Sequence, residues 1–191
     1  DDLDLNPLLI SVDGADRINY NRDRERNSVP DTLDKEIVRD AARFLNDGEK
    51  MQLSYAVQNT HRTVGTRTSS HIVQNFGMRN SFQPDHLTVK LKGSAVQSLG
   101  AFAAPGLKIE VSGDANDYVG KGLSGGIIVV RPPMASPLKA SDNTIIGNTV
   151  LYGATDGLLF AAGRAGERFA VRNSGAKVVV EGCGSNGCEY M

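Results

Sequence analysis

The sequence predicts a mainly β fold, a β-solenoid with an N-terminal α/β cap, and three observations in its second half lead to this prediction. Seventeen of the 21 glycines lie between Gly93 and Gly187. A glycine precedes each of four short, β-prone apolar runs, and these four are Gly106, Gly126, Gly157 and Gly175. The steps between them are 20, 31 and 18 residues. A fixed period of about 20 residues is typical of units that stack on one another.

The long step is explained by an inserted loop. The 11 residues from Pro132 to Asp142 carry Pro, Ser and Lys without an apolar period, and removing them reduces the step of 31 to 20. Glycine suits the turns between short strands because it adopts positive φ and allows close backbone approach. We therefore predict structural corners at Gly113, Gly120, Gly122, Gly126, Gly147, Gly153, Gly157, Gly163, Gly166, Gly175 and Gly182.

Composition argues against several classes of function. The chain has 191 residues, 40% of them hydrophobic, and a net charge of −1. It therefore lacks the basic surplus with which proteins capture nucleic acid or an anionic membrane surface. Two cysteines and the absence of a long apolar run predict a cytoplasmic protein without disulfides. Because the chain starts at Asp1, without a methionine, and stops at Met191 inside a repeat, we expect a fragment of a longer polypeptide. The parent is expected to be plastidic if it carries an upstream transit peptide.

The first 92 residues hold 27 of the 43 charged side chains and differ in pattern from the rest. Residues 1–29, with a polar run from Asp13 to Asn27, are predicted to be an arm or linker. Residues 30–85 are predicted to form the α/β cap, and residues 86–191 the solenoid. The cap would cover the exposed edge of the first repeat.

The cap is expected to contain a helix, a strand and a second helix. The first helix begins after Asp31 or Thr32 and ends at Gly48. Its apolar residues at helical spacing are Leu33, Ile37, Val38, Ala41, Phe44 and Leu45. Alternating residues predict a strand over 51–57, a turn follows over 59–65, and the second helix is expected over 68–76.

Two GxGxxG motifs, at residues 120–125 and 182–187, match the spacing of dinucleotide-binding turns. Such a turn needs a helix that opens at the third glycine, so that its amides meet a pyrophosphate. A strand pattern follows the first motif, and only four residues follow the second. The phosphate-loop pattern around Lys121 also fails, because Ala115 and Gly122 occupy its required Gly and Ser/Thr positions. We therefore favour corners over nucleotide binding.

The cysteine, histidine and acidic side chains do not form a recognisable metal-binding or catalytic pattern. Cys183 and Cys188 lack further ligands for a metal and are expected to be buried small apolar side chains. His61, His71 and His86 are scattered, with no nucleophile elbow near them. Catalysis by a pair of carboxylates, as in β-helix polysaccharide lyases and hydrolases, is left open by the spacing alone. Turn formation is favoured over calcium binding for Asp114, Asn116, Asp117, Asp142 and Asp156. We predict no catalytic, cofactor or metal site in this chain.

Four segments, 113–126, 143–155, 163–176 and 181–191, resemble the C-terminal glycine-repeat (GXGXG) domain of the glutamate synthase large (alpha) subunit, and residues 59–67 and 93–95 are also similar. Val96 stands where that family commonly has glycine. The resemblance implies a right-handed parallel β-helix. It also implies a parent enzyme that moves the amide nitrogen of glutamine to 2-oxoglutarate, giving two glutamates, with FMN and an iron-sulfur cluster in other domains.

Competing functions remain open at this point. The first is a structural, non-catalytic domain of glutamate synthase, whose partners are the amidotransferase and FMN-binding synthase domains of the same polypeptide. The second is a free-standing β-helix subunit that acts as an assembly partner of a multi-subunit oxidoreductase, as in formylmethanofuran dehydrogenase. A ligand-binding or catalytic β-helix is the least favoured. We also expect the isolated fragment to self-associate through its last strand.

Overall fold

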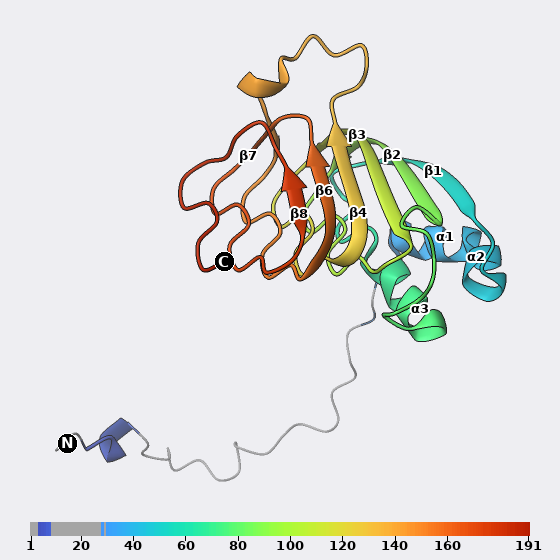
Figure 1. Ribbon diagram of the computed structural model, residues 1–191, viewed down its shortest axis with the longest axis horizontal. Coiled ribbons are helices and arrows are strands. Elements are labelled where there is room, and N and C mark those ends of the chain that lie inside the picture. The colour runs from blue at the N-terminus through green and yellow to red at the C-terminus, as the bar shows by residue number, and fades with distance from the viewer. Residues whose placement is uncertain (1–3, 9–27, 29) are drawn as a thin grey trace. The chain divides into compact units, whose positions relative to one another are not determined.

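The computed structural model describes residues 4–8, 28 and 30–191 of the chain (Figure 1). The chain divides into two units, Asp1–Pro30 and Asp31–Met191. In the first unit the structure describes a short 3₁₀ turn, η1 (Asn6–Leu8). The rest of the predicted arm, including the run from Asp13 to Asn27, lies outside the described residues.

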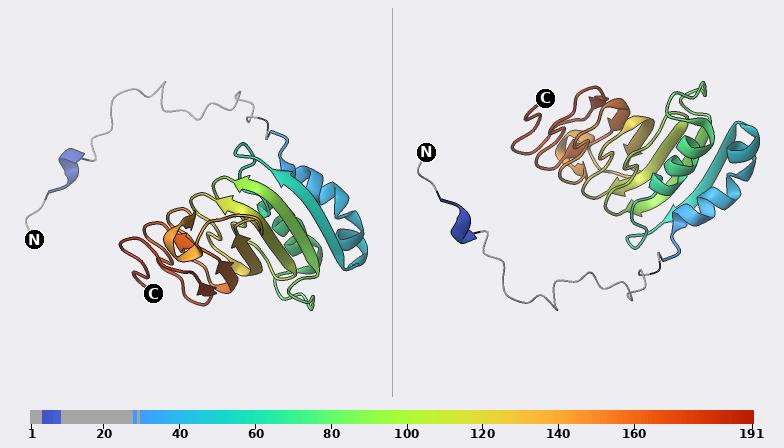
Figure 2. Two further views of the ribbon diagram at one scale, coloured as in Figure 1. Left: turned by 90° about the horizontal axis from the view of Figure 1, so that it is seen from above. Right: turned by 90° about the horizontal axis from the view of Figure 1, so that it is seen from below.

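Three α-helices lie near the β1 end of the sheet (Figures 1 and 2). They are α1 (Leu33–Asp40), α2 (Ala42–Asp47) and α3 (Thr66–Phe76). The single helix predicted between Thr32 and Gly48 is therefore divided at Ala41, where φ is −82° and ψ is 13°. Gly48 ends α2 with φ of +71°, a left-handed conformation that glycine adopts without steric cost.

Eight strands form one parallel sheet. They are β1 (Met51–Val57), β2 (Leu87–Ala95), β3 (Leu107–Ala115), β4 (Ser124–Arg131), β5 (Thr144–Ile146), β6 (Asp156–Ala161), β7 (Arg164–Ala165) and β8 (Lys177–Val179). The order along the sheet is β1-β2-β3-β4-β6-β8, and β5 pairs with β3 and β7. The inserted loop leaves the end of β4 and contains a 3₁₀ turn, η3 (Ala140–Asp142).

The predicted β-solenoid, and with it the right-handed parallel β-helix, is wrong. The structure is an α/β fold in which helices flank an eight-stranded parallel sheet that does not close on itself. The repeat places Leu87 opposite Leu107 and Ile127 opposite Leu158. Such spacing fixes which strands pair, but an open parallel sheet satisfies it as well as a solenoid does. Off the main path the described residues form only β5 and β7, of three and two residues.

The core lies against one face of the sheet, as alternation along each strand requires. In β2 the side chains of Leu87, Val89 and Leu91 are buried, whereas Lys90 between them is exposed. Side chains from the helices join this core, and the largest fully buried ones are Phe44, Ile37, Ile72, Leu87, Leu91, Leu99, Leu107, Ile109, Leu123, Ile128, Ile146 and Leu151. In the described parts of the chain, no helix has the length and apolar character needed to cross a membrane.

Candidate functional site

Five stacked turns follow strands of the sheet and form the most regular feature outside it. We call residues 98–102, 118–122, 149–153, 168–172 and 186–190 the turn ladder. In every turn the first, third and fifth residues have φ between 55° and 64°. Most of these positions are not glycine: Ser98, Phe102, Tyr118, Thr149, Leu151, Arg168, Ala170, Arg172, Asn186, Cys188 and Tyr190. A left-handed conformation is uncommon for such residues, so glycine spacing alone did not predict the ladder.

Backbone hydrogen bonds in the ladder alternate in direction. Tyr118 donates its amide to the carbonyl of Asn148 in the following turn (2.9 Å), and Gly122 donates likewise to Tyr152 (2.9 Å). Gly120, between them, donates back to Leu99 in the preceding turn (2.9 Å). Turns 98–102, 149–153 and 168–172 repeat this pattern, whereas in the last turn only Cys188 donates, back to Phe169 (2.6 Å). Each inner turn is therefore bonded to both of its neighbours.

This bonding argues against nucleotide binding at the two GxGxxG motifs. A phosphate site needs several unpaired amides that point to one place. The amides of Gly120, Lys121 and Gly122 already donate to backbone carbonyls, and that of Gly184 donates to Gly166 (3.0 Å). The first motif runs into strand β4 and the second into the last turn of the ladder, so neither opens a described helix. Lys121 instead lies over the ring of Tyr118, with Nζ 5.8 Å from the ring centroid.

Asx side chains connect successive turns. Oδ1 of Asp117 accepts a hydrogen bond from the amide of Asn148 (2.8 Å), and Oδ1 of Asn148 accepts one from the amide of Glu167 (2.8 Å). Asn116 and Asp156 accept bonds from the amides of Asp117 and Gly157. These contacts are typical of turn-forming Asx residues. The described residues contain no cluster of three His, Cys, Asp or Glu side chains that could hold a metal ion.

The predicted corner glycines fall into two groups. Five have φ in the left-handed range: Gly113, Gly120, Gly122, Gly153 and Gly157. The other six lie outside that range: Gly126, Gly147, Gly163, Gly166, Gly175 and Gly182. Gly120, Gly122 and Gly153 belong to the turn ladder.

Gly157 and Gly175 exclude larger residues for different reasons. Gly157 has φ of +108°, and an added Cβ would lie 2.6 Å from the carbonyl oxygen of Gly126. Gly175 does not have positive φ, but an added Cβ there would overlap the carbonyl oxygen of Thr155. Glycine is therefore required at position 175 because the backbone at Thr155 approaches closely, and not because the chain adopts positive φ there.

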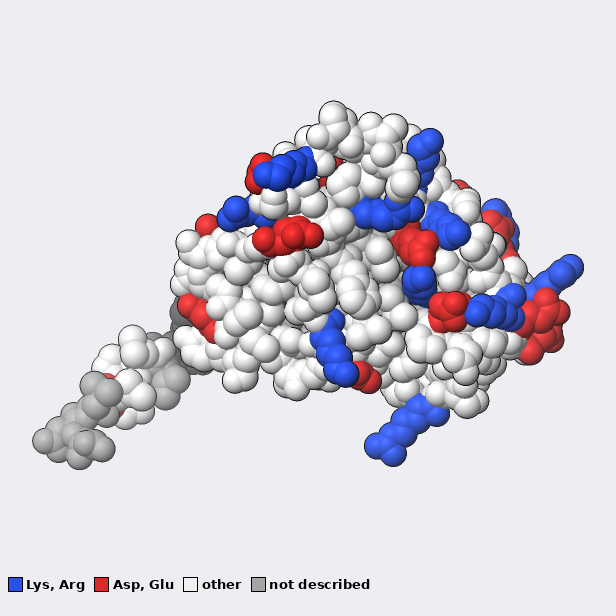
Figure 3. Space-filling model, turned by 45° about the horizontal axis from the view of Figure 1, so that its top comes forward, with Lys and Arg blue, Asp and Glu red and all other residues white. Residues whose placement is uncertain are grey.

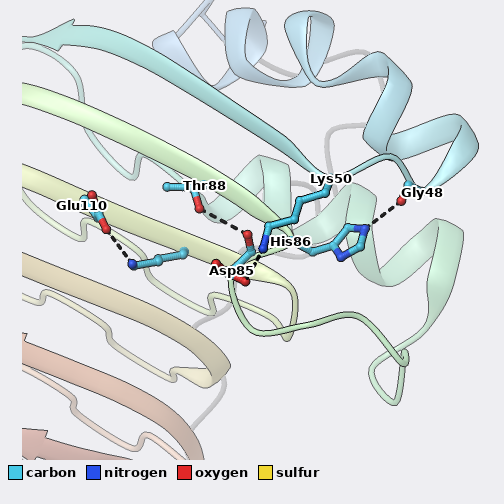
Figure 4. A network of polar contacts seen from close by, with 7 residues as sticks. Gly48, Lys50, Asp85, His86, Thr88 and Glu110 are labelled. Carbon is cyan, nitrogen blue, oxygen red and sulfur yellow. Dashed lines mark hydrogen bonds and ion pairs between the residues drawn. The ribbon is translucent and has the colours of Figure 1, made fainter.

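The cysteines and histidines do not form a site. Cys183 and Cys188 are exposed, so the expectation that they are buried is wrong. His86 places Nε2 2.7 Å from the carbonyl oxygen of Gly48 (Figure 4). The centroid of its ring lies 4.5 Å from that of the Phe82 ring. Since a carbonyl oxygen only accepts, Nε2 carries the proton.

Two ion pairs lie to one side of His86 (Figure 4). Lys50 contacts Asp85 (2.9 Å), and Lys108 contacts Glu110 (2.6 Å). The hydrogen bond from Lys50 holds the pKa of the Asp85 carboxyl below its ordinary value. All four side chains are partly exposed, so these pairs contribute little to folding stability.

Asp34 is a structurally important residue that sequence reasoning missed. Its side chain, only 2% exposed, accepts hydrogen bonds from the amides of Gly65 (3.0 Å) and Arg67 (2.7 Å) and from Oγ1 of Thr68 (2.7 Å). Helix α3 has Gly65 as its N-cap, which lacks a side chain, so a carboxylate from α1 supplies the capping oxygen. Nothing in the local sequence indicates a partner more than 30 residues away.

Helix α3 is also bonded to the connection around the first turn of the ladder. Thr66 donates its hydroxyl to the carbonyl of Ala101 (2.9 Å), and Ser69 accepts the amide of Ala104 (3.2 Å). Asp34, α3 and this connection therefore form one hydrogen-bonded unit. Through it the helices hold the start of the turn ladder in place.

A family model described as "GXGXG motif" matches residues 34–191. The glutamate synthase [NADPH] large chain of Azospirillum brasilense is 66% identical over 191 residues, which are 100% of this chain and 12% of that protein. The corresponding large chain of Bacillus subtilis is 42% identical over 99% of this chain and 12% of its own length. Ferredoxin-dependent glutamate synthase 2 of Synechocystis is 48% identical over 83% of this chain and 10% of its own length. The chain thus spans about one tenth of the relatives that it matches.

Proposed function

The chain belongs to the GXGXG-motif family, and on this basis we propose that it is a structural, non-catalytic domain of a glutamate synthase large chain. The observation that carries the proposal is the 66% identity, over the whole of this chain, with a large chain of that name. In this role the domain holds neighbouring domains of the same polypeptide in a fixed relation, and the parent protein is cytoplasmic or plastidic.

The bonding of the turn ladder supports a structural role. Amides in the ladder are bonded to neighbouring turns rather than pointed at a common centre. Asx side chains that could act as ligands accept hydrogen bonds from the backbone instead. The predicted corner glycines serve, in this proposal, to let successive segments approach closely. Such an arrangement favours rigidity over chemistry at this part of the molecule.

The proposed parent reaction transfers the amide nitrogen of glutamine to 2-oxoglutarate and yields two glutamates. We assign glutamine hydrolysis, FMN and the iron-sulfur cluster to the amidotransferase and synthase domains outside this chain. The matched relatives carry NADPH, NADH and ferredoxin in their names. We infer that this domain does not decide which electron donor the parent uses.

A complementation experiment tests the proposal. The 191-residue chain and a parent polypeptide that lacks it are produced separately and then mixed. We expect the chain alone to bind no FMN and to hydrolyse no glutamine. We expect the truncated parent to lose glutamine-dependent glutamate formation and to recover it when the chain is added. Glutaminase activity in the chain alone, or full activity of the truncated parent, would contradict the proposed role.

A further inference from the structure

The outward-facing side chains of the sheet change from charged to apolar along one row. The paired residues in this row are, from β1 to β8, Ser54, Lys90, Glu110, Val129, Phe160 and Val179. A second row runs through Gln52, Thr88, Lys108, Ile127, Leu158 and Lys177. In both rows the apolar residues begin at β4. We call Ile127, Val129, Leu158, Phe160 and Val179 the outer patch.

Two residues of the outer patch are exposed where a folded domain would ordinarily place polar residues, and Ile127, Val129 and Leu158 are half-buried. Phe160 is 42% exposed and Val179 is 61% exposed. Figure 3 shows charged side chains crowded at the end of the molecule that carries α1, α2 and β1, and a largely uncharged area across its middle. Scattered apolar residues on a surface need no explanation, but a contiguous group on neighbouring strands marks an interaction surface.

A hollow at the edge of the patch indicates what kind of surface fits it. Its volume is about 250 Å³, and it is lined by side chains that include Val129, Phe160, Val179, Arg131 and Glu181. Apolar side chains form much of its wall, and one cation and one anion stand at its rim. Within the part of the chain that the structure describes, neither Arg131 nor Glu181 has an ion-pair partner.

We propose that the outer patch is the surface on which this domain packs against another domain of the same polypeptide. This inference rests on the proposed function, and the occupant follows from length. The Azospirillum relative contains this entire chain in 12% of its residues, so most of that polypeptide lies outside it. The contacting surface carries an apolar side chain that enters the hollow, with a carboxylate placed for Arg131 and a hydrogen-bond donor for Glu181.

Hydroxyl-radical footprinting tests this inference directly. The oxidation rate of Phe160 is measured in the isolated 191-residue chain and in the full-length polypeptide that contains it. We expect oxidation of Phe160 to be at least about fivefold slower in the full-length protein. Equal rates would overturn the inference. Slow oxidation in the isolated chain that becomes faster on dilution would also overturn it, because a second copy would then cover the patch.

A pair of variants provides a control in the same row of the sheet. Phe160→Ser removes an apolar side chain from the patch, and Lys90→Ser removes a charged one from the opposite half. We expect Phe160→Ser to lower the melting temperature of the full-length protein more than that of the isolated chain, and Lys90→Ser to lower both equally. An equal effect of Phe160→Ser in both contexts would overturn the inference.

The two proposals fail in distinguishable ways. If added chain restores activity to the truncated parent while Phe160 stays exposed in the full-length protein, the holding role survives and the outer patch does not. If Phe160 is protected but the added chain restores nothing, the packing surface stands and the holding role fails.

Discussion

Replacement of Asp34 by alanine should destabilise the protein far more than removal of any exposed carboxylate. The side chain is buried and accepts three hydrogen bonds at the start of α3. Alanine leaves the amide of Gly65 and the hydroxyl of Thr68 without an acceptor, in places that water does not reach. Each buried donor left unpaired costs about 1–3 kcal/mol. We therefore expect Asp34→Ala to lower the free energy of unfolding by about 4 kcal/mol.

A double-mutant cycle separates the lost hydrogen bonds from other effects. Thr68→Val removes the donor hydroxyl while keeping the shape of a side chain that is 0% exposed. In the Asp34→Ala background this hydroxyl has already lost its acceptor, so its removal should cost about 1–2 kcal/mol less than in the parent protein. Urea unfolding followed by circular dichroism measures all four free energies.

Two results would refute this account of Asp34. One is a loss of less than about 1 kcal/mol in Asp34→Ala, below the cost of a single buried unpaired donor. The other is strict additivity with Thr68→Val. Asp31→Ala is the matched control on the same helix end. Asp31 pairs with Lys35 at 2.7 Å on an exposed surface, so its removal should leave the unfolding midpoint unchanged.

Three further outcomes are expected. Gly157→Val should lower the unfolding free energy by about 3 kcal/mol or more, because positive φ and the Gly126 carbonyl both oppose a side chain. Burial and the hydrogen bond to Asp40 raise the pKa of Tyr55, so the unfolded chain loses this proton first. Stability should therefore fall as the pH rises above about 10, and less so in Tyr55→Phe. Thr149→Asn should raise the free energy of unfolding by about 1 kcal/mol, because a β-branched residue resists the φ of 55° at this position and asparagine tolerates it better.

Nearby positions provide controls for the glycine and threonine variants. Gly153 has φ of +63° with nothing within 4 Å of an added Cβ, so Gly153→Val should show the backbone strain without the clash. Equal losses for Gly153→Val and Gly157→Val in urea would contradict the role of close contact. An equal loss of stability at high pH in Tyr55→Phe and in the parent protein would contradict the assignment to Tyr55. Thr155 does not have positive φ, so Thr155→Asn should not raise the free energy of unfolding.

Local patterns predicted the elements better than their assembly. The alternation over 51–57 gave the bounds of β1, and the glycine before each apolar run marked the starts of β3, β6 and β8 to within two residues. The solenoid prediction failed because spacing along the chain fixes strand neighbours, such as Leu87 and Leu107, without fixing whether the sheet closes. The division of the first helix at Ala41 leaves no sign in its apolar period.

The features of the candidate site depend on long-range contacts that a single sequence does not display. Asp34 looked like an ordinary acidic residue in the first turn of a helix, yet its partners begin 31 positions later. Leu151 and Arg168 adopt left-handed conformations that neither residue type favours. Stacking against adjacent turns imposes them, so only the assembled structure reveals the ladder.

The alternating amides of the turn ladder also affect its electric field. In an α-helix all peptide dipoles add, and the helix ends attract ions. In the four turns from 98–102 to 168–172, two amides that donate to the following turn flank one that donates backward, so the backward amide offsets part of the dipole along the stacking direction. The backbone dipole along this stack is therefore smaller than that of an α-helix, in which every amide points the same way. Formal charge at the ladder is carried by exposed side chains such as Arg168 and Arg172, so substitutions there can change the charge without removing the backbone hydrogen bonds.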